Sequence, residues 1–232
     1  MKQIILFIAI ATLTLSCSKD SIDSIEEVNQ NKELKTYSYV YQGNRYDLKI
    51  DFSDPDQPEL QPGEHNEFME KVFDLPNLVT IITDDNDHIY HLFDDMEAYK
   101  NSDFKKELNN NPTDTDTDRS SNIGADVKLF WDINYGGSSI SYSAFSYTEI
   151  SNLHEIGWGD KVSSIEVNGY NAEFYFYEDT RFRGKVIGTV HGTYPYAPTT
   201  SYWRDLRRNK MNSTPWSRSW NDRISSLIII KR

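Results

Sequence analysis

Apolar and polar residues alternate along most of this chain, which predicts a protein built mainly of β-strands. In the N-terminal half, four alternating runs predict strands: 37–41, 46–50, 78–83 and 88–93. Gly43-Asn44 and an acidic turn join them into two hairpins. Two further stretches carry apolar residues at helical spacing: 64–73 and 94–108. Residues 36–108 are therefore expected to form a small acidic α+β domain.

The second half of the chain repeats one pattern of aromatic and glycine residues. The first copy has an aromatic strand followed by the bend Tyr135-Gly136-Gly137. The second copy has another aromatic strand followed by the bend Phe182-Arg183-Gly184. Each copy is followed by Trp-x-Asp-x-x-Ser-Ser, at 158–164 and again at 220–226. A two-fold repeat of short strands predicts two Greek keys forming one β-sandwich. This domain spans 126–232, behind a polar, low-complexity linker at 109–125.

The second copy of the Ser-Ser motif resembles a known family signature. Asn221-Asp222-Arg223-Ile224-Ser225-Ser226 fits (Asn/Asp)-(Asn/Asp)-x-x-(Ser/Thr)-Ser, which is typical of microbial calcium-binding βγ-crystallins. The first copy departs at its first position, where Gly159 has no side chain. The resemblance covers about residues 126–232 only. It implies a βγ-crystallin-like sandwich with two calcium sites, each built from both Greek keys.

The resemblance also implies the ligands of each site. The first site would use the Trp131 carbonyl, Asp160, the Lys161 carbonyl and Ser225. The second would use the Glu178 carbonyl, Asn221 or Asp222, the Arg223 carbonyl and Ser163. Oxygen ligands of these kinds suit Ca²⁺. The second site is expected to bind calcium better, because the first contains Gly159, which offers no ligand, and the positively charged Lys161. The alternative is the same fold without useful calcium binding, because Asp and Ser also cap turns.

The first residues are those of an export signal. A positive Lys2 and a short apolar run predict a signal peptide over 1–16, and the run is too short to span a bilayer. Leu13–Cys17 resembles the lipobox of bacterial lipoproteins, in which the Cys is acylated. Lipidation at Cys17 would anchor the protein in the bacterial envelope, at the outer membrane or cell surface, through a tether over 17–35. The alternative is an ordinary cleaved signal. Cys17 is the only cysteine, so no disulfide is expected.

Charge divides the chain into two parts. Residues 18–126 carry 26 acidic and 10 basic side chains, whereas residues 127–232 carry 10 and 13. Five of those 13 cations lie in an insertion of the second key, 194–218. Its aromatic and basic residues suit an anionic glycan or a protein partner, with nucleic acid less expected: Tyr202, Trp203, Arg204, Arg207 and Arg208. The alternative is a solvated loop that pairs with the acidic N-terminal part.

Catalytic motifs are absent from the sequence. It contains no Gly-x-Ser-x-Gly elbow, no phosphate loop and no cysteine free for nucleophilic chemistry. We therefore expect no enzyme. The leading hypothesis is a calcium-binding envelope lipoprotein in which calcium stabilises the paired keys. The alternative is a secreted or surface binding or inhibitor module that uses the insertion, and a third is a purely structural surface protein.

Overall fold

The computed structural model describes residues 34–51, 53, 59–84, 89–110, 124–191, 199–209 and 219–232. The predicted signal peptide, Cys17 and most of the predicted tether and linker lie outside the described residues. Within the described part, no helix is long and apolar enough to cross a membrane.

The N-terminal segment, residues 34–110, combines strands and helices. Its strands are β1 (Leu34–Tyr41), β2 (Asn44–Asp51), β3 (Glu59–Leu60), β4 (Val79–Asp84) and β5 (Ile89–Phe93). Its helices are α1 (Asn66–Phe73), α2 (Met96–Asn101) and α3 (Asp103–Asn110). The two predicted hairpins are confirmed, since β1 pairs with β2 and β4 with β5. The single helix predicted over 94–108 is wrong, because Ser102 is extended (ψ 153°) and its hydroxyl accepts from the Lys105 amide at 3.1 Å.

The C-terminal domain, residues 124–232, contains the remaining strands and three short 3-10 helices. Its strands are β6 (Ala125–Phe130), β7 (Ser139–Ala144), β8 (Tyr147–Ile150), β9 (Ser164–Gly169), β10 (Ala172–Asp179), β11 (Arg183–His191), β12 (Thr199–Trp203) and β13 (Ser226–Lys231). The 3-10 helices are η1 (Ile133–Tyr135), η2 (Leu153–Ile156) and η3 (Leu206–Arg208). The mainly β class is confirmed, and the aromatic strands predicted near 127–131 and 174–177 are β6 and β10.

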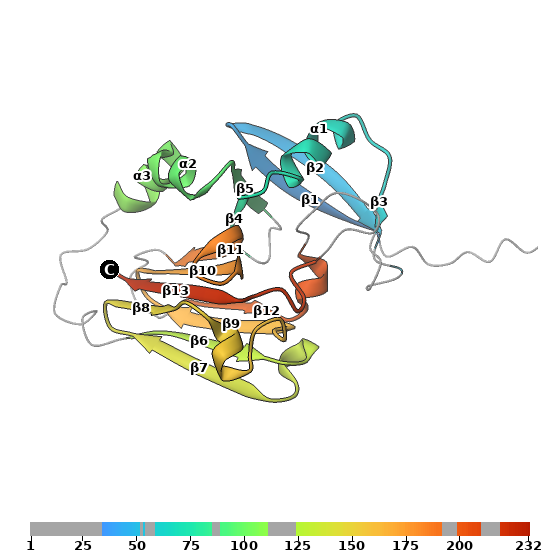
Figure 1. Ribbon diagram of the computed structural model, residues 1–232. Coiled ribbons are helices and arrows are strands. Elements are labelled where there is room, and N and C mark those ends of the chain that lie inside the picture. The colour runs from blue at the N-terminus through green and yellow to red at the C-terminus, as the bar shows by residue number, and fades with distance from the viewer. Residues whose placement is uncertain are drawn as a thin grey trace, which may run out of the picture. The chain divides into compact units, whose positions relative to one another are not determined.

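The C-terminal strands form two Greek keys that exchange one strand each (Figure 1). In the first key, β6 pairs with β7 and β9, whereas β8 pairs with β13 of the second key. In the second key, β10 pairs with β11 and β13, whereas β12 pairs with β9 of the first key. Each sheet therefore contains strands from both keys. Neither key can complete its sheet alone, so the two fold as one sandwich.

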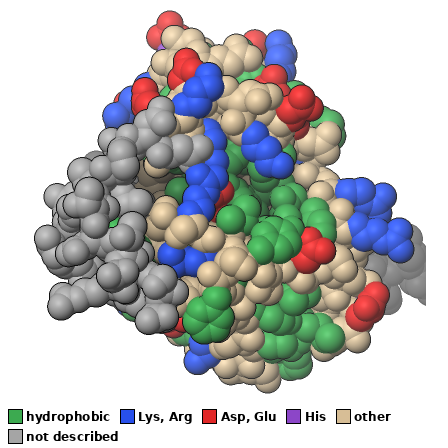
Figure 2. Space-filling view, turned by 90° about the vertical axis from the view of Figure 1, so that its left-hand side faces the viewer, with side chains coloured by type: hydrophobic (Ala, Val, Ile, Leu, Met, Phe, Trp, Pro, Cys, Tyr) green, Lys and Arg blue, Asp and Glu red, His purple; other side chains and the backbone are tan. Residues whose placement is uncertain are grey.

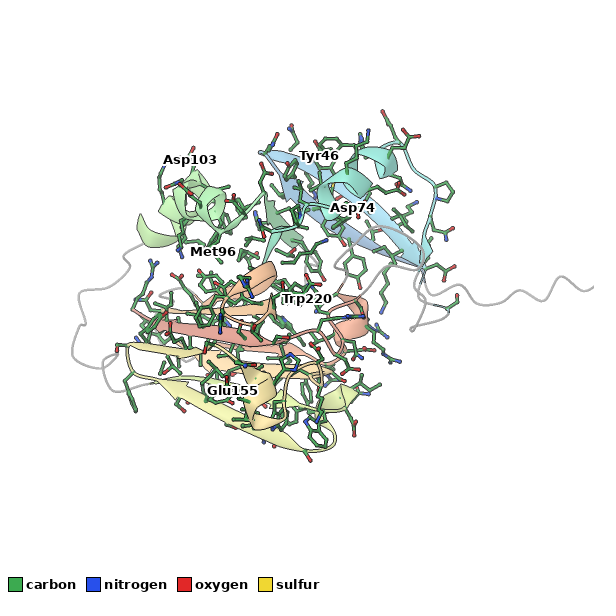
Figure 3. The ribbon with its side chains drawn as sticks, viewed as in Figure 1. Tyr46, Asp74, Met96, Asp103, Glu155 and Trp220 are labelled. Atoms are coloured by element: carbon green, nitrogen blue, oxygen red, sulfur yellow. The ribbon has the colours of Figure 1, made fainter. Side chains whose placement is uncertain are left out.

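The core of the sandwich consists of residues that alternate along the facing strands. Leu129 and Ile165 from one sheet pack in the same buried cluster as Phe174 and Phe176 from the other. Trp220, at the start of the second signature loop, is almost fully buried and lies inside the C-terminal domain (Figure 3). Burial of large aromatic side chains contributes about 1.5–3 kcal/mol each. The signature loops are thus attached directly to the core.

The N-terminal segment extends one sheet of the C-terminal domain. Strand β4 pairs in parallel with β11, with Val79 opposite Val186 and Ile81 opposite Gly188. Among the described residues, nine strands then follow one another in the order β3-β2-β1-β5-β4-β11-β10-β13-β8. The predicted division at 109–125 does not interrupt this sheet. Because backbone hydrogen bonds join β4 to β11, the strands of the N-terminal segment continue a sheet of the C-terminal domain.

Buried polar contacts reinforce this junction. The Thr189 hydroxyl donates to the Ile82 carbonyl at 2.6 Å, and the Lys185 ammonium donates to the Phe73 carbonyl. Lys105 of α3 forms a 2.6 Å ion pair with Glu173 of β10. Each contact joins the N-terminal segment to β10 or β11. The acidic N-terminal part is therefore held by specific buried partners as well as by apolar packing.

Basic and acidic side chains are interspersed on the face of the molecule that includes α3 (Figure 2). Figure 2 also shows hydrophobic side chains at this surface. The most exposed large apolar residues described are Phe145 and Tyr147, in and beside the β7–β8 turn.

Candidate metal centre

The two signature loops have the same backbone conformation. Asp160 and Asp222 both adopt the left-handed region, with φ of 55° and 54°. The Asp160 amide donates to the Ile224 carbonyl at 3.2 Å, and the Asp222 amide donates to the Val162 carbonyl at 3.0 Å. Each loop thus binds the other through matching hydrogen bonds. The internal repeat seen in the sequence becomes a pseudo-two-fold contact between the keys.

The last Ser of each signature fixes the hairpin of its own key. Ser164 donates to the Asp132 carbonyl at 2.6 Å, and Ser226 donates to the Asp179 carbonyl at the same distance. Each hydroxyl also accepts a backbone N–H from the hairpin. These two serines are fully buried and hold the hairpins in place.

A glycine is required at the bend of each hairpin. Gly137 and Gly184 adopt φ of 70° and 74°. A Cβ at Gly137 would lie 2.7 Å from the Asp132 carboxylate, and one at Gly184 would lie 3.0 Å from that of Asp179. The left-handed backbone strains a larger residue, and the Asp carboxylate would also have to move aside. The glycines noted in the sequence therefore shape the hairpins beside the signature loops.

The preceding Ser of each signature contacts the Asp of the opposite key. Ser225 donates to Asp160 Oδ1 at 3.1 Å, and Ser163 donates to Asp222 Oδ1 at 3.2 Å. Both serines are buried. Two oxygen clusters result, which we call the Asp160 site and the Asp222 site. The structure brings together the Asp and Ser side chains that the sequence pairs.

Each hairpin carbonyl lies beside the opposite site from the one expected from the sequence. The Ser163 amide donates to the Phe130 carbonyl at 2.9 Å, which places Trp131 next to Ser163 and hence beside the Asp222 site. The Ser225 amide donates to the Tyr177 carbonyl at 2.9 Å, and Glu178 lines one cavity with Asp160 and Ser225. The reason is that Ser and hairpin belong to the same key in each case. Only the Asp crosses from the other key.

The Asp222 site contains an unsatisfied acceptor. Asn221 donates through Nδ2 to Asp222 Oδ2 at 2.8 Å, while its Oδ1 is buried and has no hydrogen-bond partner within the described residues. Burial raises the pKa of Asp222; hydrogen bonding from Ser163 and the charge of Arg223 oppose this shift, and Asp160 adds to it. A carboxylate next to a buried, unpaired amide oxygen favours a cation. The residues present therefore fit a calcium ion.

The Asp160 site has a histidine where its signature lacks a side chain. A Cβ at Gly159 would lie 2.2 Å from His154 Cγ, so the imidazole ring occupies the space above this glycine. His154 Nε2 lies 3.0 Å from Ser225 Oγ and 3.8 Å from Asp160 Oδ2. Sequence reasoning missed His154, because nothing in its spacing relates it to Ser225, 71 positions away. The imidazole engages the hydroxyl that would face an ion.

Replacing Gly159 by Asn should therefore destabilise the protein although it completes the family signature. The His154 ring would have to leave, which removes its contact with Ser225 and costs about 1 kcal/mol. We expect a fall in melting temperature of about 2–4 °C. In a His154→Ala background, Gly159→Asn should cost nothing further, because the ring and its contact with Ser225 are already gone, as differential scanning calorimetry can check. An equal extra loss from Gly159→Asn in the wild-type and His154→Ala backgrounds would contradict this account of Gly159.

The neighbouring cations lie close to both clusters. The Lys161 ammonium lies 5.0 Å from the centroid of the Trp131 ring, which holds it by a cation–π contact. Arg223 lines the same cavity as Asp160. No group of three His, Cys, Asp or Glu side chains in the described ranges is placed to hold a metal. An ion here would depend on carbonyl, hydroxyl and amide oxygens in addition to one carboxylate per site.

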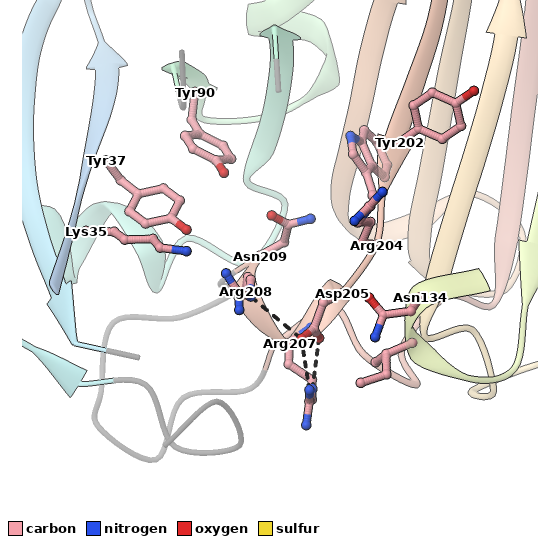
Figure 4. A pocket seen from close by; sticks show the side chains of 12 residues that line it. Lys35, Tyr37, Tyr90, Asn134, Tyr202, Arg204, Asp205, Arg207, Arg208 and Asn209 are labelled. Carbon is pink, nitrogen blue, oxygen red and sulfur yellow. Dashed lines mark hydrogen bonds and ion pairs between the residues drawn. The ribbon is translucent and has the colours of Figure 1, made fainter. Parts of the chain in front are cut away.

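The insertion forms a second site, a cavity of about 450 Å³ (Figure 4). All five predicted partner residues line it: Tyr202, Trp203, Arg204, Arg207 and Arg208. The opposite wall comes from the N-terminal segment, with Lys35 and Tyr37 of β1 and Tyr90 of β5. Sequence reasoning missed these three, because it gave the N-terminal part no role and did not predict that its sheet joins the C-terminal domain.

Comparison with known proteins finds similar solved structures for the C-terminal domain. No family model and no curated protein matches the chain. Solved structures do match. One described as the evolution of the eye lens βγ-crystallin domain fold is 25% identical over 46% of this chain and 86% of its own, with a TM-score of 0.34.

Two further matches come from other organisms. A βγ-crystallin of Ciona intestinalis is 24% identical and covers 44% of this chain and 95% of its own, with a TM-score of 0.30. A βγ-crystallin domain of Flavobacterium johnsoniae is 19% identical and covers 46% and 94%, with a TM-score of 0.27. The paired Greek keys described above define a βγ-crystallin-like fold over about 45% of the chain. The resemblance predicted from the signature motif is confirmed at the level of fold.

Proposed function

We propose that this protein is a non-enzymatic calcium-binding module in which calcium stabilises the contact between its two Greek keys. One observation carries the proposal. Each signature Asp meets a Ser of the opposite key, at 3.1 Å and 3.2 Å, so an ion bound to either Asp would join both keys. Calcium accepts carboxylate, amide, hydroxyl and carbonyl oxygens together. The predicted export signal and Cys17 would place this module on the bacterial envelope, held by lipid.

The Asp222 site is the stronger of the two in this proposal. Asp222, Asn221 and Ser163 would hold the ion there, with the Trp131 and Arg223 carbonyls. At the other site, Asp160, Ser225 and the Glu178 and Lys161 carbonyls would serve, in competition with His154. The unpaired Asn221 oxygen supports this ranking, since a bound cation would give it a partner.

Calcium should raise the melting temperature of the full chain. An ion that binds only the folded state stabilises it by RT ln(1 + [Ca]/Kd), about 2.7 kcal/mol at a hundredfold excess over Kd. We expect a shift of about 5–10 °C on that basis, reversed by EDTA. Melting curves in millimolar calcium, in magnesium and in EDTA test this. Identical curves in all three would overturn the proposed function.

We also infer a second function, a partner-binding role for the insertion. The five insertion residues selected from the sequence line one cavity, which supports this reading over a solvated loop. The alternative sequence expectation was that these Arg residues pair with the acidic N-terminal part. Asp205, which belongs to the insertion, is one partner of both Arg207 and Arg208.

A further inference from the structure

Strand β7 is an open edge of the four-stranded sheet, which runs in the order β12-β9-β6-β7. Its inner side pairs with β6 in continuous register, from Ala125 opposite Ala144 to Phe130 opposite Ser139. No strand in the described part of the chain pairs with its outer side (Figure 1). The outward N–H and C=O groups of such an edge can take up another strand.

The internal repeat relates β7 to a strand whose outer edge is already occupied. Strand β7 is the second strand of the first key, and β11 is the second strand of the second key. Each pairs on its inner side with the first strand of its own key, β6 or β10. The outer side of β11 takes up β4 in parallel. The same position in the fold therefore accepts an added strand in one key and is open in the other.

Strand β7 also lacks the features that protect edge strands. The sequence has no charged residue and no proline between Asp132 and Glu149, and the register of β7 with β6 contains no bulge. Charges, prolines and bulges are the devices by which natural proteins keep exposed edges from pairing. The other open edges in the described ranges differ, since β3 has two residues, β8 carries the exposed Glu149 and β12 is followed directly by Arg204.

The distribution of charge favours a second copy of this chain as the source of the added strand. The acidic N-terminal segment extends the other sheet beyond β11, on the side of the sandwich away from β7 (Figure 1). Residues 127–232 carry 10 acidic and 13 basic side chains, so two copies that meet through β7 would join nearly neutral domains. Charges farther apart than about 10 Å are largely screened at ordinary ionic strength, so the two acidic segments would repel each other little.

We propose that two copies of this protein pair through β7, with the two strands antiparallel and related by a two-fold axis at Ser141. A two-fold pair brings the same patch of each copy together, and the outer edge of β7 then continues the sheet of the other copy. The two four-stranded sheets become one. This assembly goes beyond the calcium role and does not depend on it.

The register follows from the two ends of the strand. At one end, the Ser143 carbonyl already accepts from the Thr148 hydroxyl at 2.9 Å, so the new pairing is centred nearer the middle, at Ser141. In that register Phe145 lies opposite Gly137 of the second copy. Phe145 is 74% exposed, and Gly137 has no side chain to obstruct its ring. The pairing thus covers the most exposed large apolar residue described.

Sedimentation velocity of the full chain in EDTA tests the pairing. We expect a monomer–dimer equilibrium with a Kd of about 10–100 µM, because a six-residue edge is smaller than the interface of a stable dimer. Ser141→Lys should weaken the dimer about tenfold or more, because it places two like charges opposite each other. Ser141 is exposed, so its melting temperature should stay within about 2 °C of the wild type. Glu97→Gln, at an exposed position of α2, changes the net charge equally and should leave the dimer intact.

Disulfide cross-linking tests the register. Cys17 is the only cysteine, so the variants are made in a Cys17→Ser background. Ser141→Cys should form a disulfide between copies, whereas Ser139→Cys, which would face Ser143, should do so about tenfold more slowly. A chain that stays monomeric up to about 1 mM, a dimer that Ser141→Lys leaves unchanged, or equal cross-linking of the two cysteine variants would each overturn the inference.

Discussion

Replacing Glu173 by Ala should lower the free energy of unfolding by about 3–5 kcal/mol, the cost of leaving buried charges without their partner. Glu173 is 3% exposed and its Oε1 lies 2.6 Å from both Lys105 Nζ and Arg232 Nε. Tyr175 donates to its other oxygen and also contacts Tyr99 of α2. Burial lowers the pKa of Lys105 and Glu173 opposes that shift, so the substitution strands a buried ammonium. Urea unfolding measures the loss.

The matched control for this substitution is Glu149→Ala, on β8 of the same sheet. Glu149 is exposed and accepts a hydrogen bond from Tyr147 at 2.7 Å, so its loss should change stability by less than about 0.5 kcal/mol. The double variant Lys105→Met/Glu173→Leu should recover much of the loss, because it removes both members of the pair. If Glu173→Ala is as mild as the control, the N-terminal segment is not held by this network.

Asp222→Ala should remove most of the calcium-dependent rise in melting temperature, whereas Asp160→Ala should remove a smaller part. In EDTA, Asp222→Ala should be mildly destabilising, because the buried Ser163 hydroxyl loses its acceptor and alanine tolerates the left-handed backbone of this position less well than aspartate. Because each variant is compared with itself in EDTA, loss of the calcium-dependent rise distinguishes a lost ligand from a damaged fold. Calorimetric melting of the variants with and without calcium provides the measurement.

Asp103→Ala is the control for the aspartate variants, because Asp103 is exposed and pairs only with Lys106 among the described residues. It should keep the full calcium response. If Asp160→Ala removed more of the response than Asp222→Ala, the ranking of the two sites would be reversed, and the contact of His154 with Ser225 would have to be a support of the Asp160 site.

Local sequence patterns predicted the C-terminal fold because each feature that shapes a key is local. The Gly137 and Gly184 bends, the aromatic strands and the Ser-Ser pairs all act within one key or at the contact between the two copies. The family signature also predicted which Asp would meet which Ser. Its carbonyl assignment was wrong, since which hairpin lies beside a signature Ser is set by the backbone hydrogen bonds from Ser163 to Phe130 and from Ser225 to Tyr177.

The junction between the two halves could not be predicted from the sequence. Strand β4 alternates like any other strand, and nothing in Val79 or Ile81 identifies β11 as a neighbour. Glu173 is one acidic residue among many in the sequence, and only the fold places it opposite Lys105. Contacts between residues far apart in sequence, His154 with Ser225 included, depend on tertiary packing that no local pattern encodes.

Calorimetric titration of calcium into the full chain tests the central claim most directly. The account predicts heat of binding that fits two unequal sites, the tighter lost in Asp222→Ala and the weaker lost in Asp160→Ala. A titration without heat, together with a melting temperature that calcium leaves unchanged, would contradict it and leave a βγ-crystallin-like fold whose Asp and Ser residues only fasten the two keys together.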